Sequence, residues 1–195
     1  AIVMLRAINF NYIAEKYGDT QSTNTLKYIR NVCTNMTVLE EAVAYAGDGH
    51  FLLLLHYNDK KALVSRLSSL NSTVTQYNGF PDNGYKLNIA YSIYEVERSG
   101  EKQTVHRMID KVRMAENNAA ARYGSLTYDF YGDMLRENYF KRAEIEGRMQ
   151  SALENNEFHL FYQPKYNLNR GGMDGSEILV RWFDEKIDKY RNPGE

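Results

Sequence analysis

The residue types and spacing that most suggest chemistry are those of Glu177, Leu179 and Arg181, which alternate along a predicted strand. A carboxylate at the end of a strand can support a divalent metal, and a guanidinium can bind phosphate through parallel hydrogen bonds. The alternation places Glu177 and Arg181 on the same face of the strand. Two ordinary solvated strand residues would show the same periodicity, so the spacing leaves both interpretations open.

A second candidate is the short run from Gly47 to Phe51, which joins two apolar segments. Glycine tolerates positive φ and aspartate can bond its own backbone, so this run predicts a tight turn. Within it, His50 beside Asp48 could act as a metal ligand. A turn histidine that bonds water or backbone is the favoured interpretation.

The composition excludes several classes of function. The 24 basic and 25 acidic residues give a formal net charge of −1, so we expect no nucleic-acid partner. No apolar run is long enough to cross a membrane and no signal peptide is visible, so we expect a cytoplasmic segment without membrane contact. The lone Cys33 cannot form an internal disulfide, and we interpret it as a buried structural thiol in a reducing compartment.

We expect the sequence to be cut at both ends. The chain opens inside an apolar strand and stops after Asn192-Pro193-Gly194 without a closing element. We therefore expect a longer parent protein, whose other regions could include sensors or a membrane anchor.

Apolar periodicity predicts a layered domain over the first 131 residues. Its strands are expected at residues 1–9, 37–46, 51–57, 85–93 and 126–131, and its helices at 10–17, 26–33, 59–70 and 105–112. Gly18 is expected to end the first helix. The strand at 85–93 alternates apolar and polar residues, so we expect it to be half-buried. The order β-α-α-β-β-α-β-α-β predicts an α/β (α+β) fold with helices packed on a mostly antiparallel sheet.

The pattern changes after residue 131. Residues 132–156 are charged, lack proline and carry spaced apolar side chains, which predicts a long linker helix. Residues 158–162 and 177–182 are predicted strands, joined through a Gly171-Gly172 turn region. The predicted domains are therefore 1–131, 132–156 and 157–195.

Three stretches in the last part of the chain occur in a recognisable order, namely residues 152–158, 162–166 and 177–182. The third keeps all three fixed positions of a Glu-x-Leu-x-Arg signature. Together they resemble the opening of an EAL domain, a family of cyclic-di-GMP phosphodiesterases. The resemblance implies that this segment forms the first strands of a truncated EAL barrel.

The EAL resemblance also implies roles for single residues in a complete domain. Glu177 would bind a catalytic Mg²⁺ or Mn²⁺ ion, and Gln163, Leu179 and Arg181 would help to hold cyclic di-GMP. The rest of the metal shell would lie beyond residue 195. We therefore expect no cofactor for this fragment and Mg²⁺ or Mn²⁺ for the longer protein.

Two further sets of positions lie in the first part of the chain. They are Phe10, Ile13, Tyr17-Gly18 and Leu26, and the run Gly47-Asp48-Gly49-His50-Phe51 followed by an apolar strand. With this spacing and element order, residues 1–131 resemble a GGDEF domain, the diguanylate cyclase family. The resemblance implies a nucleotidyl-cyclase-like fold.

The GGDEF resemblance includes departures that bear on activity. A cyclase of this family needs two aspartates at the end of the first strand and a carboxylate in the central turn, because two metals must neutralise charge during phosphoryl transfer. The first-strand positions fall on Arg6 and Ile8. Aligned on Phe51, the Asp-Glu pair of the turn becomes Gly49-His50. We therefore expect a degenerate domain without cyclase activity.

Other family positions depart as well. The guanine-binding asparagine corresponds to Ala14 and a later aspartate to Thr23. A lysine near the phosphates corresponds to Asn117, and the product-inhibition motif Arg-x-x-Asp falls on Val38 and Glu41. Each change removes charge or hydrogen bonding that a phosphate site requires.

The resemblances together imply a regulatory or dimerising GGDEF-like domain in a bacterial cyclic-di-GMP signalling protein, whose full-length form is a phosphodiesterase. One alternative is a non-catalytic receptor for cyclic di-GMP or GTP, and another is a protein-interaction scaffold. The expected partners are cyclic di-GMP, through a complete EAL domain, and a second copy of the chain in a homodimer.

Overall fold

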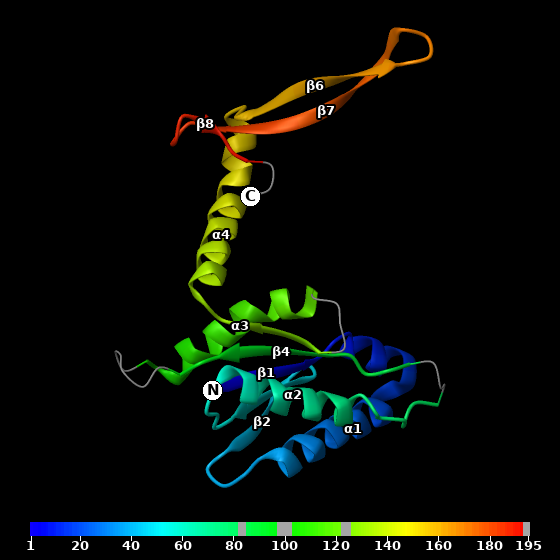
Figure 1. Cartoon of the computed structure of the whole chain (residues 1–195), viewed down its shortest axis with the longest axis vertical. Helices are drawn as coiled ribbons and strands as arrows, with labels where there is room; N and C mark the ends of the chain where they lie inside the picture. The colour runs from blue at the N-terminus through cyan, green and yellow to red at the C-terminus, as the bar shows by residue number, and fades with distance from the viewer. Residues whose placement is uncertain (82–84, 97–102, 122–125, 193–195) are drawn as a thin grey trace. The chain divides into compact units, whose positions relative to one another are not determined.

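The computed structural model describes residues 1–81, 85–96, 103–121 and 126–192, without the side chains of residues 117, 118, 120 and 121. The chain folds as two units, Ala1–Leu135 and Arg136–Glu195, and each is described by itself (Figure 1). No described helix is long and apolar enough to cross a membrane.

The first unit is built on a five-stranded sheet with strand order β2-β3-β1-β4-β5. Its strands are β1 Ile2–Ala7, β2 Ala42–Gly47, β3 His50–Leu54, β4 Ile89–Tyr94 and β5 Thr127–Phe130. Every pairing is antiparallel except β4–β5, which confirms the predicted mostly antiparallel sheet. Because β1 lies at the centre, residues near its end are held between β3 and β4.

Helices cover both faces of this sheet (Figure 1). They are α1 Phe10–Met36, α2 Lys60–Val74 and α3 Val105–Ala121. α1 and α2 pack on one face through a core that includes Ile13, Cys33 and Leu67, whereas Val112 of α3 joins Met4 on the other. Burial raises the pKa of the Cys33 thiol to about 12, which agrees with the predicted structural role. The α+β layer fold is confirmed.

Two details of the first unit bear on the sequence predictions. Gly18 interrupts α1 with a φ of 80°, so two helical segments meet there, as predicted. The predicted half-buried strand at 85–93 is wrong, because β4 begins only at Ile89 and all of its residues are buried. The side chains of Ala90 and Ser92 point to the face that α3 covers, so that face is not solvated.

The second unit joins a helix to a β-hairpin. α4, Asp133–Glu154, begins at the end of the first unit and confirms the helix predicted over 132–156. β6 Phe158–Asn167 and β7 Gly172–Asp184 pair antiparallel, and the short β8 Lys189–Tyr190 adds a strand that the sequence does not indicate. Both long strands extend beyond their predicted bounds, and the described residues close no barrel.

Candidate functional site

The predicted tight turn closes the β2–β3 hairpin. Gly47 pairs with His50, which leaves Asp48 and Gly49 as the two loop residues. Their φ values of 45° and 76° are both positive, as in a type I′ turn, whose twist suits a hairpin. A Cβ atom on Gly49 would lie 2.7 Å from the Cβ atom of Phe10, so α1 packs closely against this turn.

Three polar side chains from β1, β3 and α3 meet beside the turn. Arg6 Nη1 donates to Glu116 Oε1 at 2.8 Å, and His50 Nε2 lies 2.9 Å from the same oxygen. His50 Nδ1 lies 3.1 Å from the carbonyl oxygen of Gly47, the kind of backbone partner favoured from the sequence. Both ring nitrogens therefore face acceptor oxygens. We call Arg6, His50 and Glu116 the turn cluster.

The turn cluster lies where the sequence predicts that metal ligands are lost. Arg6 projects near the end of β1, and Ile8, the other first-strand position, donates its backbone N–H to Asn88 O at 2.8 Å. Within the described residues, no group of three or more His, Cys, Asp or Glu side chains could hold a metal ion. The cluster offers instead a guanidinium and an imidazole, which are groups that bind anions.

Glu116 is the member of the turn cluster that sequence reasoning misses. It stands four residues after Val112, on the face of the helix predicted to be buried. Its side chain is only 16% exposed. An acidic residue on a buried helix face needs a basic or hydrogen-bonding partner. The position of Glu116 on the apolar face of its helix is therefore the sequence signal that could have identified it.

A cavity of about 530 Å³ opens beside the turn cluster. It is lined by Arg6, Ala7, Asn9, Phe10, Asn11, Tyr12, Asp48 and His50. Asn9 has a left-handed backbone with a φ of 59°, and its side chain does not cap α1. The N-terminal dipole of α1 and the guanidinium of Arg6 attract an anion to this cavity, and the carboxylate of Asp48 in the same lining opposes them.

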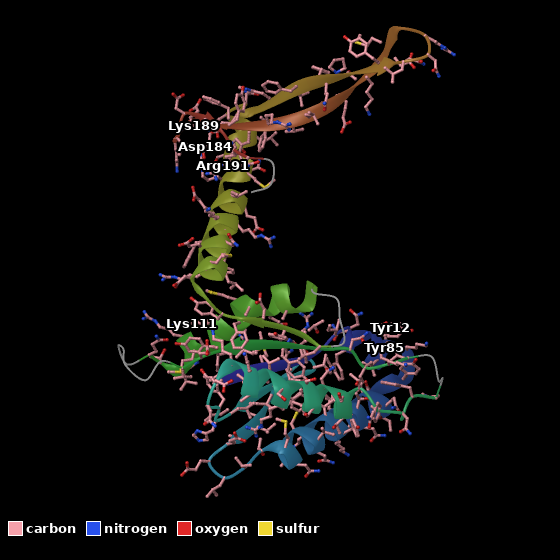
Figure 2. The ribbon with its side chains drawn as sticks, in the orientation of Figure 1. Tyr12, Tyr85, Lys111, Asp184, Lys189 and Arg191 are labelled. Carbon is pink, nitrogen blue, oxygen red and sulfur yellow. The ribbon has the colours of Figure 1, made fainter. Side chains whose placement is uncertain are left out.

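Tyr12, which Figure 2 labels beside Tyr85, is an exposed aromatic residue in the lining of the cavity. Its side chain is 44% exposed, and its ring centroid lies 5.4 Å from that of Tyr85. An aromatic ring of this kind can stack on a nucleobase. Ala14 and Thr23, which align with the guanine contacts of the family, both lie in α1, and neither offers an amide or a carboxylate.

Glu41, aligned with the product-inhibition motif, has a structural role. Its carboxylate is fully buried and accepts hydrogen bonds from Arg66 Nη1 at 2.6 Å and from the backbone N–H groups of Val38 and His56. The hydrogen bond from Arg66 is the main reason that the pKa of Glu41 falls from 4.5 to about 2. Glu41 thus ties the loop before β2 to α2.

The β6–β7 hairpin brings the four residues expected in an EAL site onto one face. Gln163 pairs with Glu177, and Leu179 and Arg181 follow on the same side of β7. Glu177 Oε2 lies 3.2 Å from Lys165 Nζ, and Arg181 donates to a neighbouring backbone carbonyl at 2.9 Å. One exposed carboxylate on this face does not make a two-metal site.

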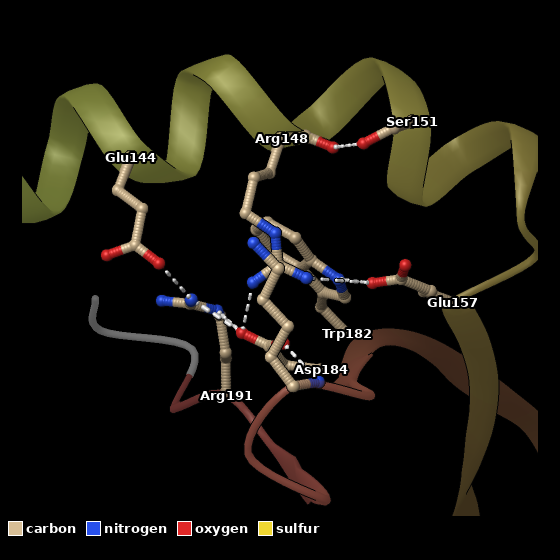
Figure 3. A network of polar contacts seen from close by, with 8 residues as sticks. Glu144, Arg148, Ser151, Glu157, Trp182, Asp184 and Arg191 are labelled. Carbon is tan, nitrogen blue, oxygen red and sulfur yellow. Dashed lines mark hydrogen bonds and ion pairs between the residues drawn. The ribbon is translucent and has the colours of Figure 1, made fainter.

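A second polar network fixes the base of the hairpin to α4 (Figure 3). Asp184 Oδ2 accepts from Arg148 Nη1 at 2.6 Å and from Arg191 Nε at 2.7 Å, and Trp182 Nε1 donates to Glu157 Oε2 at 2.8 Å. The Arg148 hydrogen bond is the main reason that the pKa of Asp184 is lowered to about 2. We call these five residues the α4 cluster, and the sequence gives no motif for it.

Curated relatives of the chain include two bacterial proteins. The biofilm architecture maintenance protein MbaA of Vibrio cholerae is 24% identical over 92% of this chain and 23% of its own length. The bifunctional diguanylate cyclase/cyclic di-GMP phosphodiesterase MucR of Pseudomonas aeruginosa is 22% identical over 93% of this chain and 26% of its own length. The chain thus spans about a quarter of the length of these relatives. No protein-family model matches it.

Two solved structures share the fold. The active GGEEF domain of a diguanylate cyclase from Vibrio cholerae covers 68% of this chain and 82% of its own, with a TM-score of 0.58 and 10% identity. The S helix-GGDEF-EAL part of Vibrio cholerae LapD, bound to c-di-GMP, covers 94% of this chain and 42% of its own, with a TM-score of 0.60 and 12% identity. The mixed α+β sheet with its helices therefore matches the GGDEF, diguanylate-cyclase-like fold, and the chain is similar to GGDEF domains of c-di-GMP signalling proteins.

Proposed function

We propose that the first unit is a non-catalytic GGDEF-like domain that regulates, or helps to dimerise, the phosphodiesterase part of a longer bacterial cyclic-di-GMP signalling protein. The observation that carries the proposal is the turn cluster. Arg6 and His50 share the single oxygen Glu116 Oε1 at the place where a cyclase of this fold needs metal-binding carboxylates.

Metal-dependent phosphoryl transfer is disfavoured at this place for an electrostatic reason. Two metal ions must neutralise the charge that develops between attacking and leaving oxygens. Arg6 brings a fixed positive charge to the site and so repels a divalent cation. Glu116, the carboxylate nearest to Arg6, is already engaged by two basic side chains. In this proposal the first unit therefore uses no metal cofactor.

The second unit supplies, in this proposal, the first strands of an EAL domain. Glu177 would be one ligand of Mg²⁺ or Mn²⁺, and Gln163, Leu179 and Arg181 would contact cyclic di-GMP. Their position on one face of the hairpin supports this assignment. Because this chain spans about a quarter of its curated relatives, the phosphodiesterase activity belongs to the longer protein.

A non-catalytic receptor for cyclic di-GMP is the second candidate. The match to LapD favours it, because that structure covers 94% of this chain and is bound to c-di-GMP. Both candidates predict an inactive first unit, and they differ only in whether the longer protein hydrolyses the ligand that it binds.

The proposal is tested by incubating the purified chain with GTP and either Mg²⁺ or Mn²⁺, and following the nucleotides by chromatography. We expect no cyclic di-GMP, whereas steady production in proportion to the protein would overturn the proposal. In parallel, cyclic di-GMP is given to this chain and to the full-length protein. Hydrolysis by the full-length protein alone supports the phosphodiesterase, and binding without hydrolysis supports the receptor.

A further inference from the structure

A stripe of exposed residues runs along the part of α4 that belongs to the second unit. Tyr139, Arg142, Glu146, Met149 and Leu153 follow one another at intervals of three or four residues, the spacing of a coiled-coil seam. Tyr139, Met149 and Leu153 are 48%, 51% and 63% exposed. Apolar side chains at this spacing on one helix face are typical of a surface that packs against another helix. We call these five residues the α4 stripe.

The hairpin leaves the α4 stripe accessible. Arg148 and Glu144 hold the hairpin through Asp184 and Arg191, so they mark the opposite side of α4 (Figure 3). With 3.6 residues per turn, the centre of the stripe lies about 140° around the helix from Arg148. A partner can therefore approach the stripe without disturbing the α4 cluster.

The middle of the α4 stripe is charged, and this limits which surfaces can bind to the stripe. Arg142 and Glu146 are exposed, and neither forms an ion pair with any other residue that the structure describes. Burying either charge in a helix–helix seam without an opposite charge would be unfavourable. The partner must therefore offer an acid opposite Arg142 and a base opposite Glu146.

We propose that the part of the α4 stripe from Tyr139 to Met149 binds the same part of a second copy of this chain in an antiparallel arrangement. Arg142 and Glu146 stand two residues on either side of Glu144, and Tyr139 and Met149 stand five residues on either side of it. A two-fold axis at the level of Glu144 therefore places Arg142 opposite Glu146 of the second copy, and Tyr139 opposite Met149. Every contact then occurs twice, as in an isologous dimer.

A parallel arrangement fits the same residues less well. It would place Arg142 beside its own counterpart and Glu146 beside its own, so like charges would meet at the centre of the seam. The antiparallel arrangement goes beyond the function proposed above, because it adds a dimer interface on the part of α4 that belongs to the second unit. Because the seam is short, we expect a weak dimer, whose fraction rises with protein concentration.

Sedimentation velocity over a range of concentrations tests the interface. We expect the wild-type chain to shift from monomer to dimer as its concentration rises. Arg142→Glu and Glu146→Arg should each weaken the dimer about tenfold or more, because each places like charges opposite one another. The double variant should restore the wild-type affinity. Lys141→Glu, which changes the charge by the same amount outside the stripe, should leave the dimer unchanged.

Cysteine cross-linking tests the orientation. A mixture of Tyr139→Cys and Met149→Cys chains should form a disulfide between copies under mild oxidation, whereas neither variant alone should do so. Cys33 is fully buried and does not compete. A wild-type chain that stays monomeric, a double variant that is not restored, or self-linking of a single variant would overturn the proposal. We expect none of these variants to make cyclic di-GMP in the cyclase assay, whether or not it dimerises. A failure of the dimer proposal can therefore be distinguished from a failure of the proposed function.

Discussion

The two units each contain a cluster in which basic side chains converge on one carboxylate oxygen, but the surroundings of the clusters differ. In the turn cluster, Arg6 is 34% exposed, and it lines a cavity beside Glu116. In the α4 cluster, Asp184 is fully buried, and the exposed fractions of Arg148 and Arg191 are 15% and 12%. The first cluster is open to a ligand, whereas the second is closed by the fold.

This difference in exposure indicates two different roles for ion pairs between basic side chains and a carboxylate. A closed cluster of charges holds elements together, and removing one partner leaves an uncompensated buried charge. An open cluster at a cavity contributes less to stability, because solvent screens its charges. The α4 cluster is therefore expected to govern the stability of the second unit, and the turn cluster to govern what the cavity of the first unit binds.

The largest expected effect comes from Asp184→Asn, which keeps the shape of the side chain but removes its charge. Arg148 and Arg191 then lose their common partner, and we expect the folded-to-unfolded ratio of the second unit to fall about a hundredfold. Trp182 is the only tryptophan of the chain and belongs to this cluster, so urea unfolding followed by its fluorescence reports this unit. Asp174→Asn, on the exposed part of the hairpin, is the matched control.

A smaller effect is expected at the turn of the first unit. Gly49→Ala should destabilise this unit by about 2 kcal/mol, because alanine is strained at positive φ and its Cβ would meet Phe10. Gly47→Ala has the same backbone strain, with a φ of 92°, but no atom within 4 Å, so it should cost about 1 kcal/mol. Hydrogen exchange in peptides from β2 and β3 measures both. Equal effects would show that Phe10 does not restrict the turn.

The third prediction concerns how the stability of the first unit depends on pH through Glu41. Its pKa in the folded protein is lowered from 4.5 to about 2, so its charge stabilises the first unit fully above about pH 4.5, and this stabilisation is lost as the pH falls towards 2. Glu41→Gln removes the contribution. The difference in stability between wild type and variant should therefore be largest near neutral pH and disappear as the pH falls through about 2. Glu40→Gln, whose side chain is 79% exposed, should show no such trend.

The smallest expected effect concerns anion binding by the open cluster. Arg6→Ala removes the guanidinium from the cavity, so any inorganic phosphate or triphosphate bound there should bind about threefold to tenfold more weakly at low salt. Titration followed by NMR chemical shifts of residues near the turn measures this change. Arg170→Ala, on the exposed end of the hairpin, is the matched control, and an equal loss in both variants would show that binding is non-specific.

Short-range features of the first unit could be predicted from its sequence. The turn followed from Gly47, Asp48 and Gly49, because glycine and aspartate tolerate the required backbone, and Gly18 marked the break in α1. Full burial of β4 could not be predicted, because the small side chains of Ala90 and Ser92 resemble a solvated face until α3 covers them.

Contacts between distant residues were the part that the sequence did not reveal. Glu116 lies 110 residues from Arg6 and 66 residues from His50, so no local spacing links the members of the turn cluster. The ion pair of Glu41 could not be predicted for the same reason, because its partner Arg66 is 25 residues away in the sequence. Such pairings depend on which elements the fold brings side by side. The roles expected for Glu177 and its neighbours in an EAL site stay predictions.

The central claim, that the turn cluster replaces a metal site, is tested most directly by calorimetry. The chain is titrated with GTP and with ATP, with and without Mg²⁺, at two salt concentrations. We predict weak binding that Mg²⁺ does not strengthen, that higher salt reduces, and that hardly distinguishes the two nucleotides, because Ala14 and Thr23 offer no guanine contacts. Tight, Mg²⁺-dependent binding that selects GTP would contradict the account and identify the first unit as a GTP-binding domain.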